Sequence, residues 1–211
     1  GYILNLFFPA DHWIQTWRDH HPDWDVKVWG NDDYRQGSWI NQKHLESLWK
    51  AQSWIGVSNL LRLEILYKHG GIYVDADSIC LRPLDDWILE SEFFACWAND
   101  IGPQKRINNA FMGSVPDNPF LRFVIDYIRA KRNVTTRMTL RGPRPAKTWK
   151  ATGVMPLNIC LEKFPYTNAT LLPCHMFHPR HRLRKDYAGG GRVYADHLYA
   201  GTSKLYSLAH P

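Results

Sequence analysis

The chain has 211 residues, of which 45% are hydrophobic and 22% are charged, and its formal net charge is +6. This length predicts one domain over residues 1–211, and the apolar fraction with ten tryptophans excludes a disordered chain. No apolar run approaches the roughly 20 residues of a membrane helix, so we expect neither a transmembrane segment nor a signal peptide. Gly1 in place of an initiator methionine leaves open that the domain is excised from a longer protein.

The first part of the chain alternates strand and helix patterns. Residues 2–8 form a short apolar run that Pro9 ends, which predicts a strand. A helix is expected over residues 12–19 with Asp11 as its cap. Residues 24–29 alternate in polarity like a second strand.

Two further helices are expected before a strand. The pattern predicts one helix over residues 45–54 and another that Ser58 caps. The second is apolar nearly all round, so we expect it to be buried and to end at Gly70 in a left-handed conformation. Residues 72–74 then predict a short buried strand.

The second half continues the alternation. Residues 93–97 predict a strand, and a helix is expected to begin at Pro119, directly after Asp117. Residues 132–153 are rich in Pro, Gly, Lys and Arg with weak periodicity, which predicts a mobile loop or a lid near the site. Helices alternating with strands favour an α/β sheet.

Two carboxylates, Asp75 and Asp77, end the predicted strand at 72–74 with one residue between them. Alternation along a strand points both to the same side. In an open α/β sheet, ligands bind outside the carboxyl ends of the strands. Acidic side chains there are costly unless a positive group meets them, and a hard divalent cation prefers oxygen ligands. The pair therefore suggests a cation site in an enzyme that handles a nucleotide diphosphate.

Basic residues gather at 131–150 and at 175–185. Solvated loops are one interpretation, and a positive rim around an anionic ligand such as a diphosphate is the other. We expect no nucleic-acid partner, because no recognised binding module is present. The four cysteines contain no C-x-x-C pair, which argues against a zinc site. The sequons at Asn133 and Asn168 do not fix a compartment, and both a cytoplasmic and a Golgi-lumenal location stay open.

The run G-V-S-N-L-L-R-L-E-I-L-Y-K-H-G-G-I-Y-V-D-A-D, residues 56–77, resembles the DXD sugar-binding region of glycosyltransferase family 32. This group includes yeast-type initiating mannosyltransferases, capsular polysaccharide transferases and domains of large DNA viruses. Fainter similarity lies upstream, over residues 17–29. Further similar segments lie downstream in the expected order, over residues 107–121, 151–158 and 197–203. The resemblance thus extends over most of the chain.

The resemblance implies a GT-A fold, with a single mixed, mainly parallel sheet flanked by helices. It implies transfer of a hexose from a nucleotide sugar, a UDP-sugar in our interpretation, with retention at the anomeric carbon. Mn²⁺ is the implied cofactor, with Mg²⁺ as an alternative. The acceptor would be a hydroxyl of a glycan or of a lipid- or protein-linked precursor.

The resemblance also assigns roles to residues. Asp77 would coordinate the metal, Asp75 the metal or the ribose, and His197 would be the third metal ligand from the far end of the chain. Arg62 joins the two aspartates as a catalytic residue and would contact donor hydroxyls or phosphate oxygens. The remaining residues that we expect at the donor are Asn59, Asn108, Asn109, Phe7, Thr202 and Lys204.

Several of these assignments have a structural alternative. Arg62 would instead form a salt bridge to Glu64 or to one of the aspartates, and His197 would be a surface histidine. Asn108 and Asn109 would be turn residues, and Phe7 a core residue.

The sequence departs from the family at two places. Asn59 replaces the aspartate that most relatives carry, and the closing tryptophan of the C-terminal motif is Ser203 here.

Two other functions compete with glycosyl transfer. The segment I-Y-V-D-A-D-S, residues 72–78, is also similar to the nucleophile loop of haloacid-dehalogenase-type phosphatases. Those enzymes need a later paired-aspartate motif, which this sequence lacks. A non-catalytic module that binds nucleotide sugars is the third interpretation.

Overall fold

The computed structural model describes residues 2–4, 11–98, 106–139, 142–164, 168–180 and 186–199. The strands in this part are β1 (Tyr2–Leu4), β2 (Lys27–Trp29), β3 (Gly71–Val74), β4 (Ser78–Cys80), β5 (Phe93–Trp97), β6 (Ile107–Ser114), β7 (Thr136–Thr139), β8 (Gly142–Pro145), β9 (Ala169–Leu172) and β10 (Ala195–His197). The helices are α1 (Asp11–His20), α2 (Asn31–Gln36), α3 (Gln42–Lys50), α4 (Trp54–His69), α5 (Asp86–Leu89), α6 (Pro119–Arg129), α7 (Thr148–Ala151), α8 (Val154–Lys163) and the 3₁₀ turn η1 (Cys174–Met176).

The largest sheet has four strands in the order β3-β6-β5-β9. Strand β6 runs antiparallel to both of its neighbours, and only β5 and β9 are parallel. Beside it, β1 and β2 form a parallel pair, and β4 and β10 an antiparallel pair. The predicted α/β class is confirmed, and the sheet is mixed. Within the described chain, however, the strands form several small sheets rather than one. The largest sheet is not mainly parallel, because β6 runs antiparallel to both of its neighbours.

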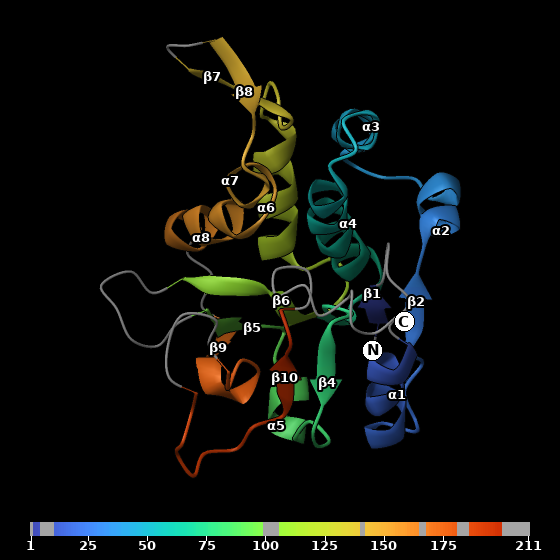
Figure 1. Cartoon of the computed structure of the whole chain (residues 1–211), viewed down its shortest axis with the longest axis vertical. Coiled ribbons are helices and arrows are strands. Elements are labelled where there is room, and N and C mark those ends of the chain that lie inside the picture. Colours follow the sequence, from blue (N-terminus) through green and yellow to red (C-terminus); the bar gives the residue numbers. More distant parts are fainter. Residues whose placement is uncertain are drawn as a thin grey trace, which may run out of the picture.

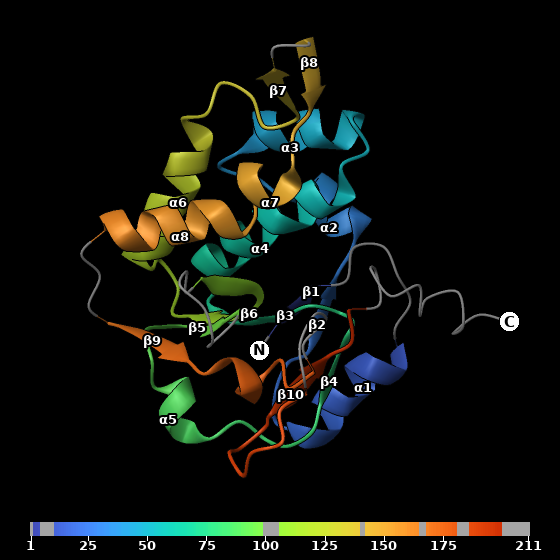
Figure 2. The same cartoon turned by 60° about the vertical axis from the view of Figure 1, so that its left-hand side comes forward.

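Both faces of this sheet are covered, one by helices alone and the other by helices together with a pair of short strands. Figure 1 shows α4, α6 and α8 on one face and α1, α5 and the β4–β10 pair on the other, and the turned view in Figure 2 agrees. Alternate residues of β3 enter separate cores, because successive side chains of a strand point to opposite faces. Tyr73 packs with the core under α4 and α6, whereas Ile72 and Val74 pack with Trp17 of α1.

Helix α4 carries the central motif and is buried as predicted, from Gly56 to Leu66, except for Ser58. It begins at Trp54, so Ser58 lies inside the helix, and the prediction of Ser58 as its cap is wrong. The predicted helix over 45–54 is α3, which ends at Lys50. Gln52 has a positive φ of 51° between the two helices, and this break assigns Trp54 to α4. Gly70 ends α4 with a φ of 66°, as its predicted conformation requires.

The remaining predicted elements are present with shifted ends. The strand at 93–97 is β5, and the helix from Pro119 is α6, whose cap is Asn118. Only residues 2–4 of the first predicted strand and 27–29 of the second form strands in the described chain. No helix of the described chain is long and apolar enough to cross a bilayer.

The described parts of the segment 132–153 contain regular secondary structure rather than only the predicted loop or lid. They form the antiparallel hairpin of β7 and β8, followed by the short helix α7. A hydrogen bond from the amide of Ala146 to the carbonyl of Thr135 (2.8 Å) extends the hairpin at its base. An exposed two-stranded hairpin buries neither face, so its sequence shows no hydrophobic alternation.

Candidate active site

Asp75 and Asp77 lie in the tight turn between β3 and β4. The amide of Asp75 still donates to the carbonyl of Ala110 on β6 (2.8 Å), which fixes the end of the strand. The amide and the hydroxyl of Ser78 both donate to the carbonyl of Asp75, at 3.1 and 2.7 Å. This turn leaves the two carboxylates on one side, as the alternation predicted.

His197 reaches the carboxylates because β10 pairs with β4. In this register His197 is opposite Ser78, and the amide of Leu198 donates to the carbonyl of Asp77 (2.8 Å). Its Nε2 lies 3.1 Å from Oδ1 of Asp77 and 3.4 Å from Oδ2 of Asp75. Residues separated by about 120 positions thus meet at one point, and His197 is buried rather than a surface histidine.

Arg62 and Tyr73 hold Asp75 from the side of α4. Nη1 of Arg62 lies 3.0 Å from Oδ1 of Asp75, and the hydroxyl of Tyr73 donates to the same oxygen. The Arg62 guanidinium lies 4.3 Å from the centre of the Tyr73 ring. It also donates to the hydroxyl of Ser58 (3.0 Å) and to the carbonyl of Asn109. A salt bridge from Arg62 to an aspartate was one alternative in the sequence analysis, and Arg62 forms this bridge with Asp75.

The ionisation of the site follows from these contacts. Burial would raise the pKa of Asp75, but the Arg62 charge, with hydrogen bonds from His197 and Tyr73, lowers it to about 2. Burial would lower the pKa of His197, but hydrogen bonds and charges from Asp75 and Asp77 raise it to about 9. Burial raises the pKa of the Tyr73 hydroxyl well above its usual value, so it acts as a donor. Without a metal, the imidazolium compensates the paired carboxylates.

The predicted asparagines lie around this centre on two faces of β6. Nδ2 of Asn109 donates to Oδ1 of Asn59 (2.8 Å), next to the Arg62 contact. Asn108 points to the other face, where its Nδ2 lies 3.1 Å from Nε2 of His178. The structure therefore brings Asn59 and Asn109 together with Arg62 and separates them from Asn108.

Three of the predicted donor residues, Phe7, Thr202 and Lys204, lie outside the described residues. Their assignments stay predictions.

Two residues of the site were missed from the sequence. Tyr73 precedes Asp75 by two positions, and strand alternation alone would have placed it on the same face. His178 is buried, and its ring centre lies 5.3 Å from that of His197. No sequence pattern distinguishes His178 within its histidine- and arginine-rich surroundings.

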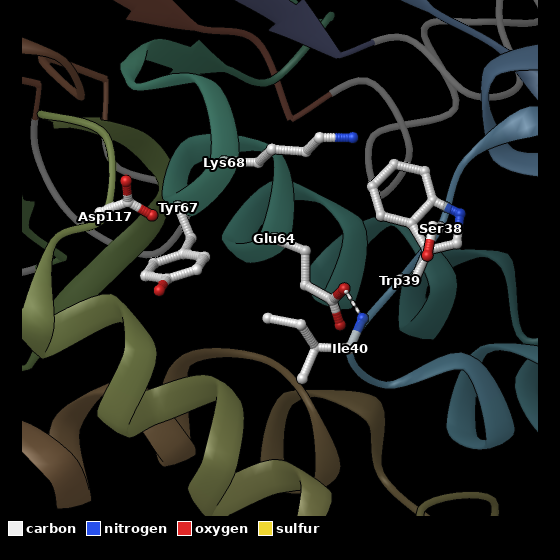
Figure 3. A pocket seen from close by; sticks show the side chains of 7 residues that line it. All are labelled: Ser38, Trp39, Ile40, Glu64, Tyr67, Lys68 and Asp117. Atoms are coloured by element: carbon white, nitrogen blue, oxygen red, sulfur yellow. Dashed lines mark hydrogen bonds between the residues drawn. The ribbon is translucent and has the colours of Figure 1, made fainter.

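A separate pocket lies along the outer part of α4, and Figure 3 shows its lining. Glu64 points into it, but both of its carboxylate oxygens accept backbone amides, from Ile40 and from Asn41. The Glu64 carboxylate thus anchors the segment before α3, and it does not pair with Arg62. The pocket shares no residue with the aspartate–histidine cluster, and its lining consists of Ser38, Trp39, Ile40, Glu64, Tyr67, Lys68 and Asp117.

The aspartate–histidine cluster fits a divalent cation. One ligand atom from each of Asp75, Asp77 and His197 lies within 4.8 Å of the others. Two carboxylates and one imidazole are a donor set that suits Mn²⁺ or Mg²⁺ better than a thiolate-preferring metal. Within the described chain, this is the one group of metal-ligating side chains arranged in this way.

Comparison with known proteins supports the same class. Residues 10–94 match the family described as "Glycosyltransferase sugar-binding region containing DXD motif". The chain is 24% identical over 192 residues to inositol phosphoceramide mannosyltransferase 2 of Schizosaccharomyces pombe, covering 90% of the chain and 51% of the relative. It is 35% identical over 85 residues to the human alpha-1,4-N-acetylglucosaminyltransferase, covering 40% of the chain and 22% of the relative.

A solved structure shares the fold. PaToxG glycosyltransferase superposes with a TM-score of 0.57 at 16% identity, over 78% of this chain and 69% of that one. The chain spans about half the length, or less, of the curated relatives that it matches. The matched motif region, the relatives along the chain and the common fold together support a DXD-containing glycosyltransferase with a GT-A-like α/β fold.

Proposed function

We propose that this chain is a metal-dependent, retaining glycosyltransferase that moves a hexose from a UDP-sugar to a hydroxyl acceptor. The observation that carries the proposal is the meeting of Asp75 and Asp77 with His197, which lies about 120 positions further along the chain. The match of residues 10–94 to a DXD sugar-binding region supports the same chemistry.

Asp77 and His197 would hold Mn²⁺ directly, with Asp75 as a further ligand or as a ligand of the ribose. The bound cation would neutralise charge on the nucleoside diphosphate as it leaves. Arg62 has a positioning role in this scheme: its ion pair keeps Asp75 ionised and fixed in direction. Because its guanidinium is already engaged by Asp75, Ser58 and Asn109, we assign contact with the donor to the neighbouring amides.

The donor sugar would lie against Asn59 and Asn109. Their mutual hydrogen bond uses Nδ2 of Asn109 and Oδ1 of Asn59, and the other two amide atoms, one donor and one acceptor, would contact sugar hydroxyls. An amide at position 59 keeps hydrogen-bonding capacity without the charge that aspartate would add. This pair therefore favours a neutral hexose.

For the stereochemistry we propose a front-face displacement, in which the acceptor hydroxyl approaches from the side that the diphosphate leaves. The carboxylates of the site are engaged: Asp75 by Arg62, Asp77 by His197, and the nearby Asp196 by Arg180. None of these is suited to attack the sugar and form a covalent intermediate. Retention is checked by the anomeric configuration of the product in NMR, and trapping of a glycosylated aspartate or glutamate would contradict the front-face route.

The names of the relatives indicate only the chemical class of the acceptor. One relative is named as acting on inositol phosphoceramide and another as transferring N-acetylglucosamine. We propose a glycan hydroxyl or a lipid-linked hydroxyl as the acceptor.

The function is tested by cleavage of nucleotide sugars with and without Mn²⁺. We expect slow Mn²⁺-dependent release of nucleoside diphosphate by the wild-type chain from one donor of a panel of UDP-sugars and GDP-mannose. The Asp77→Asn variant should lose at least about 100-fold in rate, since it removes a charged ligand of the metal. The control is Asp23→Asn, because Asp23 and Asp25 form a second, exposed D-x-D triplet.

Three results would contradict the proposal. Hydrolysis of a simple phosphate ester without any nucleotide sugar would favour the phosphatase. Donor binding without any cleavage would favour a non-catalytic module. If the Asp77→Asn variant were as active as wild type, the reaction would not depend on a metal held by Asp77.

A further inference from the structure

The hairpin β7–β8 and the helix α7 carry a concentration of positive charge that the active site does not use. Residues 129–150, here called the basic segment, contain eight lysines and arginines and no aspartate or glutamate. The net charge of this segment is therefore larger than the net charge of the whole chain, which is +6.

The hairpin of the basic segment stands apart from the aspartate–histidine cluster. Figures 1 and 2 both show the hairpin projecting at one end of the molecule, beyond α7, while β4 and β10 lie on the other side of the sheet. The sequence left open that these basic residues form a rim around the donor diphosphate. The position of the hairpin does not fit that role.

Two arginines of the hairpin face each other directly. In the β7–β8 register, Arg137 is opposite Arg144, and both are exposed. Directly opposed residues of an antiparallel pair point to the same face, and like charges in this position destabilise the pair. Neither arginine forms an ion pair with a carboxylate of the described chain. An external anion would relieve this repulsion.

The same surface continues onto α7 with an aromatic residue. Trp149 is 39% exposed, and Lys150 Nζ lies 5.0 Å from the centre of its ring. Lys147 and Lys150 are exposed as well. Lys131 joins the two parts, because its Nζ donates to the carbonyl oxygens of Lys150 and Ala151. Basic residues beside an exposed tryptophan are typical of surfaces that lie at the headgroup level of a bilayer.

A merely protective role does not account for this composition. Charges on exposed strands prevent edge-to-edge association, most often as lysine, but β7 and β8 contain no lysine, and acidic residues favour solubility more than basic ones. The complete absence of acidic residues over 129–150 indicates attraction to one sign of charge.

We propose that Arg137, Arg144, Lys147 and Lys150, with Trp149, form a docking surface for a bilayer that contains anionic phospholipids. Docking by this end would hold the chain at the membrane surface through headgroup contacts and one interfacial aromatic side chain. The proposal does not depend on the proposed glycosyl transfer, since binding needs neither metal nor donor.

The test is co-sedimentation of the 211-residue chain with vesicles, in buffer without metal or nucleotide sugar. Wild type should bind mixed phosphatidylserine–phosphatidylcholine vesicles and not phosphatidylcholine alone, and added salt should weaken the binding because it screens exposed charges. The variant R137Q/R144Q should bind about 25-fold more weakly, about fivefold for each charge removed. The variant Trp149→Ser should also bind more weakly, with the difference persisting at high salt.

The matched control is R18Q/R82Q, which removes two exposed arginines from α1 and from the segment after β4. It has the same net charge as the hairpin variant and should bind like wild type. Thermal unfolding checks that R137Q/R144Q is folded, and we expect it to be at least as stable as wild type because the opposed charges are gone.

Two outcomes would overturn the proposal. One is equal loss of binding in the two double variants, which would mean that only net charge matters. The other is binding of short DNA or RNA duplexes through the hairpin without binding of anionic vesicles, which would assign the surface to nucleic acid.

Discussion

At the scale of single residues, the site depends on how Asp75 is held. Its Oδ1 receives both Arg62 and Tyr73, and its Oδ2 lies toward His197. A carboxylate that has two fixed donors on one oxygen presents its other oxygen in a fixed direction. Pre-orientation of this kind would reduce the cost of ordering a ligand of the proposed cation site.

The contribution of the tyrosine can be measured with Tyr73→Phe. This change removes the hydroxyl that donates to Asp75 and keeps the ring under Arg62. Hydrogen bonds to charged groups contribute roughly 1.5–3 kcal/mol, so we expect the free energy of unfolding of the metal-free chain to fall by about 2 kcal/mol. Urea unfolding followed by tryptophan fluorescence gives this value.

The control for Tyr73→Phe is Tyr127→Phe on α6, which removes a hydroxyl away from the site. It should change the free energy of unfolding by less than about 0.5 kcal/mol. Equal stability of wild type and Tyr73→Phe would mean that the hydroxyl does not support Asp75.

At the scale of elements, short contacts between distant segments set the geometry. The strand β4 links both ends of the chain, since β10 pairs with it and α1 packs beside it through Thr16, whose hydroxyl accepts the amide of Cys80 (2.8 Å). His21 adds a second link, because its Nε2 accepts the amide of Leu84 (3.0 Å) while Nδ1 faces the carbonyl of Trp17 (3.2 Å). This pattern requires the neutral imidazole with its proton on Nδ1.

The His21 contact predicts a dependence of stability on pH. Burial lowers the pKa of His21, with smaller contributions from nearby positive charge. Below the usual histidine pKa of about 6.5, the unfolded chain binds a proton that folded His21 resists, so stability falls as the pH drops. The stability that His21 contributes is thus fully present above that pH and is lost below it.

The variant His21→Gln keeps an acceptor for Leu84 and cannot titrate. We expect the urea midpoint of wild type to fall more than that of His21→Gln between neutral pH and about pH 5. The difference between the two profiles isolates His21 from the other nine histidines. Parallel profiles would show that His21 does not carry this dependence.

At the scale of the whole molecule, the sequence predicted what local patterns encode. The strand before Asp75, the buried helix that ends at Gly70, and the common side of Asp75 and Asp77 follow from alternation, hydrophobicity and a glycine with positive φ. The pairing of Arg62 with Asp75 could be named only as an alternative, because the choice between partners depends on how α4 packs on β3.

Other features depend on tertiary contacts that no local pattern contains. The antiparallel course of β6 and the hairpin at 136–145 are decided by strand partners. His178 enters the site because η1 lies against the sheet, and its sequence neighbours give no signal. The place of His197 came from family resemblance, and the β4–β10 register supplies the physical reason.

The proposed function depends on one cation site formed by Asp75 and Asp77 with the distant His197. Electron paramagnetic resonance of free Mn²⁺ during titration of the chain, with UDP present and a protein-free UDP control, measures it directly. We predict one Mn²⁺ bound per chain, with affinity reduced at least about 10-fold in Asp77→Asn and in His197→Gln but unchanged in Asp23→Asn. If wild type binds no Mn²⁺, or if Asp77→Asn and His197→Gln bind it as tightly as wild type, the central claim is wrong.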